Sequence, residues 1–339
     1  MARRERHLAG LFYLHLMKKY LLLLSLFCAG KTMAQSKEWL TGVPDTSFNI
    51  NKDYRQNLKT YPFIKIAPDS VTAAVKEQRN LVYCQLGDRQ LHIDAFTPVK
   101  KSKPTPAIIM VHGGGWRSGN HTQHIPLAQH LAALGYASFT VEYRLSTEAL
   151  YPAGVNDIKS AIQWMHANAK KFNIDTNKIA ILGFSAGGQL AALVGMTSGL
   201  NKFDALNFNK PHSSAVQAVI DIDGTLSFVS PDAWETQNQQ TVAPSAWWMG
   251  YKRTERLDLW EEASPLSYAE RNKLPFLFLN SSVERMHAGR DVFKTMMDKK
   301  GVYTQIINFK DTPHTFCLYR PWFDDVVKDI DVFLAKVFK

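Results

Sequence analysis

The stretch Gly-Phe-Ser-Ala-Gly at residues 183–187 decides the fold of this chain. It follows an apolar run over 178–182 and precedes a helix-like run over 188–194. A strand, a Gly-x-Ser-x-Gly turn and a helix, in this order, form a nucleophile elbow, in which the serine hydroxyl stands clear of the backbone. The glycines permit strained dihedral angles, and the helix N-terminus directs free N–H groups at developing negative charge. We therefore predict that Ser185 is a catalytic nucleophile.

Strand-like and helix-like runs alternate on both sides of this turn. Such alternation predicts an α/β fold with a mostly parallel, eight-stranded sheet flanked by helices. The predicted strands cover residues 81–86, 90–96, 107–111, 137–143, 178–182, 215–222, 275–279 and 304–309. The predicted helices cover residues 125–134, 155–172, 188–194, 291–300 and 325–338.

Three further segments flank or interrupt this pattern. Residues 35–78 contain three prolines and no sustained period, so we expect an N-terminal extension that packs over the body. Residues 79–339 form the predicted catalytic domain. Between about residues 225 and 268 the alternation stops and Trp and Gln become frequent, which favours a cap or loop over the site.

The first 34 residues have the pattern of an export signal. A basic pair after Met17 precedes an apolar run over 20–27, and residues 32–34 suit a cleavage site. Residues 1–16 would then lie upstream of the natural start. We expect an exported protein, periplasmic or extracellular, with no membrane segment after signal removal. A membrane anchor in this leader and a lipoprotein attached through Cys28 are the alternatives.

Composition is that of an ordinary globular enzyme. The chain has 339 residues, 45% of them hydrophobic, and a formal net charge of +10. The leader holds six basic side chains and one acidic one, so the mature chain would carry half of that charge. Because no basic cluster with interleaved aromatic residues occurs, we expect no nucleic-acid partner. Cys84 and Cys317 remain after the leader; a disulfide between them is one alternative, and a packed, reduced Cys84 is the one we expect.

The predicted general base is His314, in the loop after the last strand. The order of serine, acid and histidine along the chain is the one that an elbow of this kind uses. The acid should follow the strand over 275–279, where Glu284 can reach the ring nitrogen of His314. Asp291 is the rival, although it resembles a helix N-cap, and Asp311 is the third candidate.

A second glycine-rich stretch predicts an oxyanion hole. His-Gly-Gly-Gly-Trp at residues 112–116 directly follows the strand over 107–111. Consecutive glycines let backbone N–H groups face the site, so we expect Gly114, Gly115 and Ala186 to be the donors. The alternative, a phosphate-binding loop, lacks the Lys-Ser/Thr pair that such a loop requires.

Several side chains are candidates for substrate contacts. We select Trp116, Arg285 and Trp247. Insertion tryptophans either stack on sugar rings or pack the cap onto the body: Trp234, Trp247, Trp248 and Trp260. Arginines near the acid and base loops either meet substrate carboxylates or form solvated ion pairs: Arg285, Arg290 and Arg320. Histidines at 121, 124 and 130 have no suitably spaced carboxylate or cysteine partner, so we expect no metal.

Further motifs occur in the order and at the intervals expected for a known family. They are Glu-Tyr-Arg-Leu at 142–145, Tyr-Pro-Ala-Gly at 151–154, Asn-Asp-Ile-Lys-Ser-Ala at 156–161 and Ala-Ser-Pro-Leu at 263–266. With the two glycine-rich stretches, they make residues 79–338 resemble the α/β-hydrolases related to hormone-sensitive lipase, close to bacterial bifunctional feruloyl and acetylxylan esterases. The resemblance implies an α/β-hydrolase fold and a secreted carbohydrate esterase that needs no cofactor.

Site residues also carry over by this resemblance. It implies Ser185 and His314 as nucleophile and base, and Gly114, Gly115 and Ala186 as oxyanion donors. The acid loop departs from the family's Gly-x-x-Asp, because it reads Ser-Ser-Val-Glu at 281–284. The identity of the acid therefore stays open.

These observations together predict a secreted serine esterase. We expect it to remove acetyl groups, or else feruloyl or methyl groups, from an esterified plant polysaccharide or oligosaccharide such as pectin or xylan. The basic charge and the arginines make a galacturonate-containing chain a hypothesis. A secreted peptidase or amidase, and an inactive glycan-binding homologue, are the alternatives that loss of activity in Ser185→Ala would separate from an esterase.

Overall fold

The computed structural model describes residues 40–70, 73–99, 103–204, 206, 209, 211–234 and 242–339. The chain divides into two units, Met1–Ser36 and Lys37–Lys339, and all the described residues belong to the second. The predicted leader and Cys28 lie outside the described residues.

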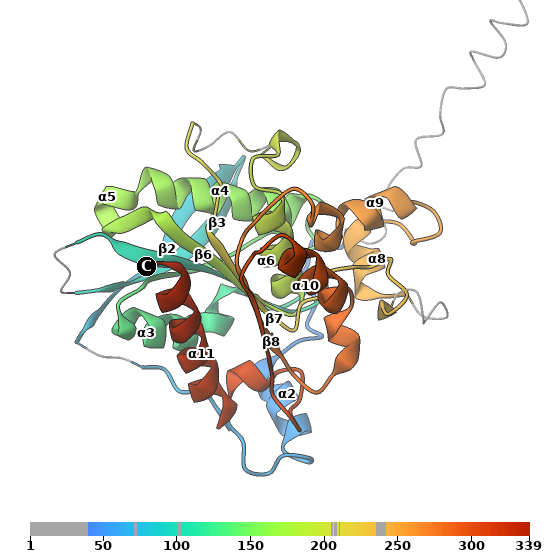
Figure 1. Ribbon diagram of the computed structural model, residues 1–339, viewed down its shortest axis with the longest axis horizontal. Coiled ribbons are helices and arrows are strands. Elements are labelled where there is room, and N and C mark those ends of the chain that lie inside the picture. The colour runs from blue at the N-terminus through green and yellow to red at the C-terminus, as the bar shows by residue number, and fades with distance from the viewer. Residues whose placement is uncertain are drawn as a thin grey trace, which may run out of the picture. The chain divides into compact units, whose positions relative to one another are not determined.

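An eight-stranded sheet forms the centre of this unit, in the order β2-β3-β5-β4-β6-β7-β8-β9 (Figure 1). The strands are β2 (Val75–Leu86), β3 (Arg89–Pro98), β4 (Thr105–Val111), β5 (Ala137–Val141), β6 (Ile174–Phe184), β7 (Ala218–Ile222), β8 (Phe276–Asn280) and β9 (Thr304–Asn308). β3 pairs antiparallel with β2 and β5, and the other pairs are parallel. The predicted sheet is confirmed.

The first strand begins earlier than we predicted. β2 starts at Val75 and pairs with Pro98 of β3, so the predicted boundary between extension and domain at residue 78 is wrong. Residues 76–80 are all polar, and a strand at the edge of a sheet needs no apolar alternation.

Helices cover both faces of the sheet. Along β4, Ile109 packs on one face with α4, α6 and α10, whereas Ile108 and Met110 pack on the other with α3 and α11. The helices are α3 (Ile125–Leu134), α4 (Ala153–Ala167), α5 (Ala169–Phe172), α6 (Ala186–Met196), α10 (Arg290–Lys299) and α11 (Trp322–Val337), with short turns η2 (His121–His124) and η3 (Asn201–Phe203). Buried parallel strands therefore receive apolar cover on both sides, as this architecture requires.

One predicted helix is divided. The run over 155–172 forms α4 and α5, which are separated at Asn168. The Asn168 side chain donates to the carbonyl of Trp164 at 2.9 Å, a local bond that competes with continuation of the helix.

The N-terminal segment and the insertion add short elements beside the carboxyl ends of the strands. The N-terminal segment contributes α2 (Ile50–Asn57) and β1 (Lys65–Ile66), and β1 pairs with β10 (Tyr319–Arg320). The insertion contributes α8 (Pro244–Met249), α9 (Leu257–Glu262) and η4 (Pro265–Tyr268).

Two of the insertion tryptophans are core residues. Trp248 stacks on Trp116 with ring centroids 5.0 Å apart, and Trp260 is buried. These two pack the insertion onto the body. Cys84 and Cys317 are buried and free, and within the described ranges no helix is both long and apolar enough to cross a bilayer.

Candidate active site

Ser185 lies at the sharp turn between β6 and α6. Its backbone has φ 56° and ψ −121°, a conformation that non-glycine residues seldom adopt. A Cβ on Gly183 would lie 1.9 Å from the carbonyl oxygen of Gly187, and one on Gly187 would lie 2.1 Å from the carbonyl oxygen of Val111. Both glycines are therefore required for the turn to form.

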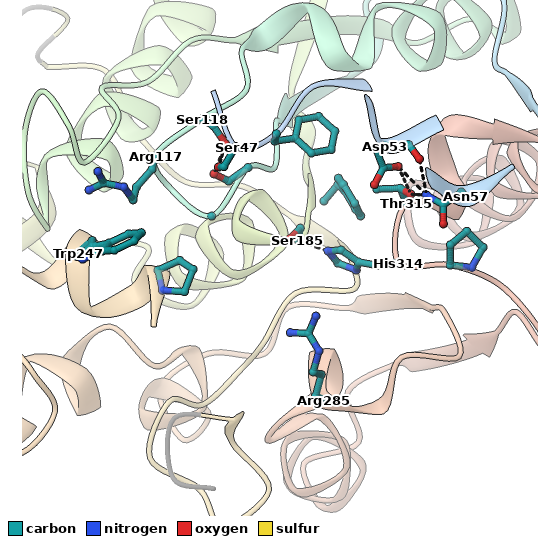
Figure 2. A pocket seen from close by; sticks show the side chains of 16 residues that line it. Ser47, Asp53, Asn57, Arg117, Ser118, Ser185, Trp247, Arg285, His314 and Thr315 are labelled. Atoms are coloured by element: carbon teal, nitrogen blue, oxygen red, sulfur yellow. Dashed lines mark hydrogen bonds between the residues drawn. The ribbon is translucent and has the colours of Figure 1, made fainter. Parts of the chain in front are cut away.

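His314 meets Ser185 as the sequence predicts. Its Nε2 lies 2.8 Å from the serine Oγ. The histidine is carried by the loop between β9 and η6 (Phe316–Leu318), and the ring of Phe184 packs beside it, with centroids 4.8 Å apart. Figure 2 shows the pair at the edge of a hollow.

The carboxylate that meets His314 is Asp223, so the prediction of Glu284 is wrong. Asp223 Oδ2 lies 2.9 Å from Nδ1 of His314. Glu284 is exposed in η5 (Glu284–His287), and no hydrogen bond among the described residues joins it to the histidine. The rival Asp291 is exposed and pairs with Arg290, and Asp311 is exposed.

Asp223 can take the place predicted for Glu284 because neighbouring strands of the sheet end side by side. Asp223 directly follows β7, which is hydrogen-bonded to β8, so a carboxylate after either strand can reach the same histidine. The signal was Asp-Ile-Asp-Gly at 221–224, in which an aspartate at the end of an apolar strand precedes a glycine. Asp223 directly follows the predicted strand over 215–222, but the expected acid lay after the strand over 275–279, with Asp311 as a third candidate.

Asp223 is buried and well supplied with donors. Its Oδ1 accepts from the backbone N–H of Ser281 at 2.8 Å and lies 3.1 Å from Nε2 of His287. Burial raises the pKa of Asp223, but the hydrogen bonds from His287 and His314 outweigh burial, so the pKa falls well below its usual value. An ionised carboxylate at Nδ1 fixes the tautomer in which Nε2 can accept the Ser185 proton.

The predicted oxyanion donors lie beside Ser185. Gly114 and Gly115 line the same hollow, with φ of 126° and 59°, and Ala186 is the first residue of α6, where backbone N–H groups have no partner in the helix. The neighbouring N–H of Gly113 donates to Oε1 of Gln123 at 2.8 Å and is not free. The arrangement fits the predicted role, which stays a prediction.

Two hollows flank Ser185. The larger, of about 390 Å³, has a polar wall, formed by Ser47, Asp53, Asn57, Arg117, Ser118 and Thr315. The smaller, of about 240 Å³, is lined mainly by apolar groups, among them Trp116, Ala186, Trp234, Pro244 and Met286. The wall residues of the N-terminal segment have no signal in the sequence, because a polar residue in a segment without hydrophobic periodicity has no predicted direction.

The predicted substrate contacts lie at these hollows. Arg285 borders both, and Trp247 lines the larger. Trp116 lines the smaller, but it is largely buried and its indole N–H donates to Gln189 at 3.0 Å. Two other candidate arginines have partners elsewhere: Arg290 bonds to Asn280 and Asp291, and Arg320 pairs with Asp324. In the described part of the chain, no group of three or more His, Cys, Asp or Glu side chains could hold a metal ion.

An eight-stranded, mostly parallel sheet with a serine elbow and a Ser185–His314–Asp223 chain of hydrogen bonds defines the α/β-hydrolase fold. The model of the BD-FAE family matches residues 93–286, which is more than half of the chain. The chain belongs to the BD-FAE family.

Relatives and solved structures agree with this assignment. The chain is 32% identical over 187 residues to an esterase, LipC, and 32% identical over 132 residues to a carboxylesterase, NlhH, both of Mycobacterium tuberculosis. The matches cover 53% and 39% of this chain and 45% and 41% of those proteins, so the chain spans less than half the length of either relative.

Two solved structures have the same fold. A truncated carbohydrate esterase from gut microbiota superposes with a TM-score of 0.65 at 22% identity, over 79% of this chain and 99% of that one. A bifunctional GH43-CE protein of Bacteroides eggerthii superposes with a TM-score of 0.67 at 22% identity, over 79% of this chain and 39% of that one.

Proposed function

We propose that this protein is a secreted serine esterase that removes acetyl groups from the sugar hydroxyls of plant cell-wall polysaccharide. The observation that carries the proposal is the hydrogen-bonded chain in which Ser185 Oγ, His314 and Asp223 are joined at 2.8 Å and 2.9 Å. The leader pattern over residues 1–34 supports export.

The chemistry follows from these positions. Ser185 Oγ attacks the ester carbonyl carbon while His314 Nε2 takes its proton, and the resulting oxyanion lies at the N–H groups of Gly114, Gly115 and Ala186. Collapse of the tetrahedral intermediate expels the sugar alkoxide, which His314 protonates. Water then attacks the acyl-enzyme, with His314 again accepting the proton, and acetic acid leaves as Ser185 is restored.

The two hollows supply sites for the two halves of such an ester. The smaller, apolar hollow suits a short acyl chain, and the larger hollow, with its hydroxyl, amide and charged side chains, suits a polar alcohol such as a sugar. The names of the similar proteins, esterase and carbohydrate esterase, support the same class of reaction.

Acetate release from acetylated xylan and acetylated pectin tests the proposal. We expect the wild type to release acetate and Ser185→Ala to lose roughly 10⁵-fold or more in kcat, with an unchanged thermal unfolding curve. Ser213→Ala, which changes an exposed serine, is the matched control and should keep full activity.

Other outcomes would favour the alternatives. Cleavage of peptide anilides without acetate release would indicate a peptidase or amidase. Binding of either polymer by the wild type without any release would indicate an inactive glycan-binding homologue.

A further inference from the structure

We propose that the larger hollow binds the carboxylate of an acidic sugar, so that the preferred esters are carried by uronate-containing chains. This inference rests on the proposed esterase function. Its basis is an arginine subsite beside Ser185, made of Arg117, Arg285 and Trp247, all of which line this hollow (Figure 2).

Arg117 is a largely buried cation with unused donors. Its side chain is 12% exposed and forms a long ion pair with Asp45, whose Oδ2 lies 3.6 Å from Nε, beyond good hydrogen-bond distance. Among the described residues, its buried Nε and Nη1 have no hydrogen-bond partner. The charge of Arg117 is therefore only partly matched by Asp45, and a ligand anion at the wall of the hollow that Arg117 lines would interact favourably with it.

The position of Arg117 is fixed before any ligand arrives. Its guanidinium lies over the indole of Trp247, 4.5 Å from the ring centroid, which is a favourable cation–π arrangement. Its backbone carbonyl accepts from the N–H of Asp45 at 3.1 Å. A guanidinium that is already ordered loses little entropy on binding, and its planar fork matches a carboxylate.

Arg285 supplies a second positive charge near the nucleophile. It is exposed, borders both hollows and extends from η5 toward Ser185 and His314 in Figure 2. No described carboxylate forms an ion pair with it, in contrast to Arg290 and Arg320, which have acidic partners. An arginine without an internal partner at the rim of a site is free to pair with a substrate anion.

The wall of the larger hollow opposite Arg117 carries groups that suit sugar hydroxyls. Asp53 and Asn57 of α2 lie on the far side of the hollow from Arg117 and Trp247 (Figure 2). A carboxylate and an amide suit sugar hydroxyls. A hexuronate carries hydroxyls and a carboxylate on one ring, so it can satisfy both walls at once, whereas a neutral pentose leaves the arginine donors unmatched.

A matched pair of small esters tests this inference. The probes are O-acetyl methyl galactopyranosiduronate and the corresponding O-acetyl methyl galactopyranoside, which differ only in the carboxylate. We expect the wild type to hydrolyse the uronate ester with a kcat/KM ten- to hundredfold higher than that for the neutral ester. A ratio of this size is the scale of a charge-assisted hydrogen bond. In Arg117→Gln and in Arg285→Gln this ratio should fall toward one, whereas Arg320→Gln, outside the hollow, should keep it.

Binding without turnover provides a second readout. Ser185→Ala should bind oligogalacturonate more tightly than neutral xylo-oligosaccharide by calorimetry, and the difference should shrink as salt is raised.

The outcomes separate the inference from the proposed function. Equal kcat/KM for the two esters, or an equal loss on both in the arginine variants, would overturn the inference while leaving the esterase in place. Failure to cleave these esters and p-nitrophenyl acetate alike would overturn the esterase proposal, and the acidic-sugar ester inference with it.

Discussion

At the scale of single residues, Asp223 is held from two neighbouring loops. It follows β7, with a left-handed backbone φ of 52°, and its Oδ1 receives donors from the loop after β8, where the sequence pattern had placed the acid. That loop therefore contributes to the same site with an N–H and an imidazole in place of a carboxylate.

Separate replacement of Asp223 and Glu284 distinguishes the two assignments of the catalytic acid. Asp223→Asn should lower kcat by about 10⁴-fold, because an amide at this position favours the wrong histidine tautomer. Glu284→Gln should retain kcat within about threefold, since Glu284 does not contact His314. Steady-state rates on p-nitrophenyl acetate measure both, and a large loss in the Glu284 variant alone would contradict the structure.

His287 acts on the reaction through Asp223, as a positioning residue. His287→Ala removes one donor from Oδ1, and we expect kcat to fall roughly ten- to hundredfold through misplacement of the acid. KM for p-nitrophenyl acetate should stay within about twofold, because His287 does not line either hollow. His287→Gln, which retains an N–H donor, should restore most of kcat; an equal loss of kcat in His287→Ala and His287→Gln would contradict this role.

At the scale of elements, α2 is tied to the loop that carries His314. Asp53 Oδ2 accepts from Thr315 Oγ1 at 2.7 Å and from the Tyr319 hydroxyl at 2.5 Å. Thr315 is the next residue after the histidine. The N-terminal segment is therefore part of the active-site framework and does more than cover the body.

Removal of this tie should affect turnover. We expect Asp53→Ala to lower kcat for p-nitrophenyl acetate about tenfold, because His314 loses a fixed orientation, with KM for this small ester within about twofold. Asp69→Ala changes an exposed carboxylate of the same segment and is the control. Equal kcat in the two variants would show that the tie has no role in positioning the base.

The motifs behind the family resemblance also have structural reasons at this scale. The guanidinium of Arg144, after β5, donates to the fully buried carboxylate of Asp157 on α4, at 2.7 Å for the shortest contact. The ring of Tyr143 stacks on His112, with centroids 4.4 Å apart. These contacts hold the segment after β5 to α4 and to the glycine-rich stretch at 112–116.

At the scale of the whole molecule, periodic segments were predictable and contacts between distant loops were not. Apolar strands such as β4 and β8, and the elbow at Ser185, have local signals that survive in the fold. The choice of Asp223 over Glu284 depends on which strand ends lie side by side, and the role of Asp53 depends on a loop far away in sequence. Neither relation has a local signal.

The stability of the fold at acidic pH should depend on Asp94. Burial raises the pKa of this carboxyl, but hydrogen bonds from His121, Asn80 and Arg79 outweigh burial, so its pKa is lowered. Because the pKa is lower in the folded state, the ionised carboxylate stabilises the fold at pH values above its pKa in the unfolded chain, about 4. This stabilisation is lost as the pH falls through the pKa of the folded state.

Urea unfolding of Asp94→Asn measures this contribution. We expect the free energy of unfolding of the variant to be about 1.5–3 kcal/mol lower than that of the wild type at pH 7. This difference in free energy should become steadily smaller below pH 4. Asp324→Asn, in an exposed pair, should differ little at either pH. A gap for Asp94→Asn that is the same at pH 7 and pH 3 would contradict the assignment.

The pairing of β1 with β10, and of Asp53 with Tyr319 across 266 residues, has a consequence for biosynthesis. A ribosome completes the helix that carries Asp53 early and the loop that carries His314 late. The nucleophile and the acid are both translated before the base loop can be anchored, because its anchor must wait for residues near 320 to emerge. The catalytic centre therefore depends on contacts that span 266 residues and carry a large loop-closure cost, and a chain that ended before His314 would carry Ser185 without its base.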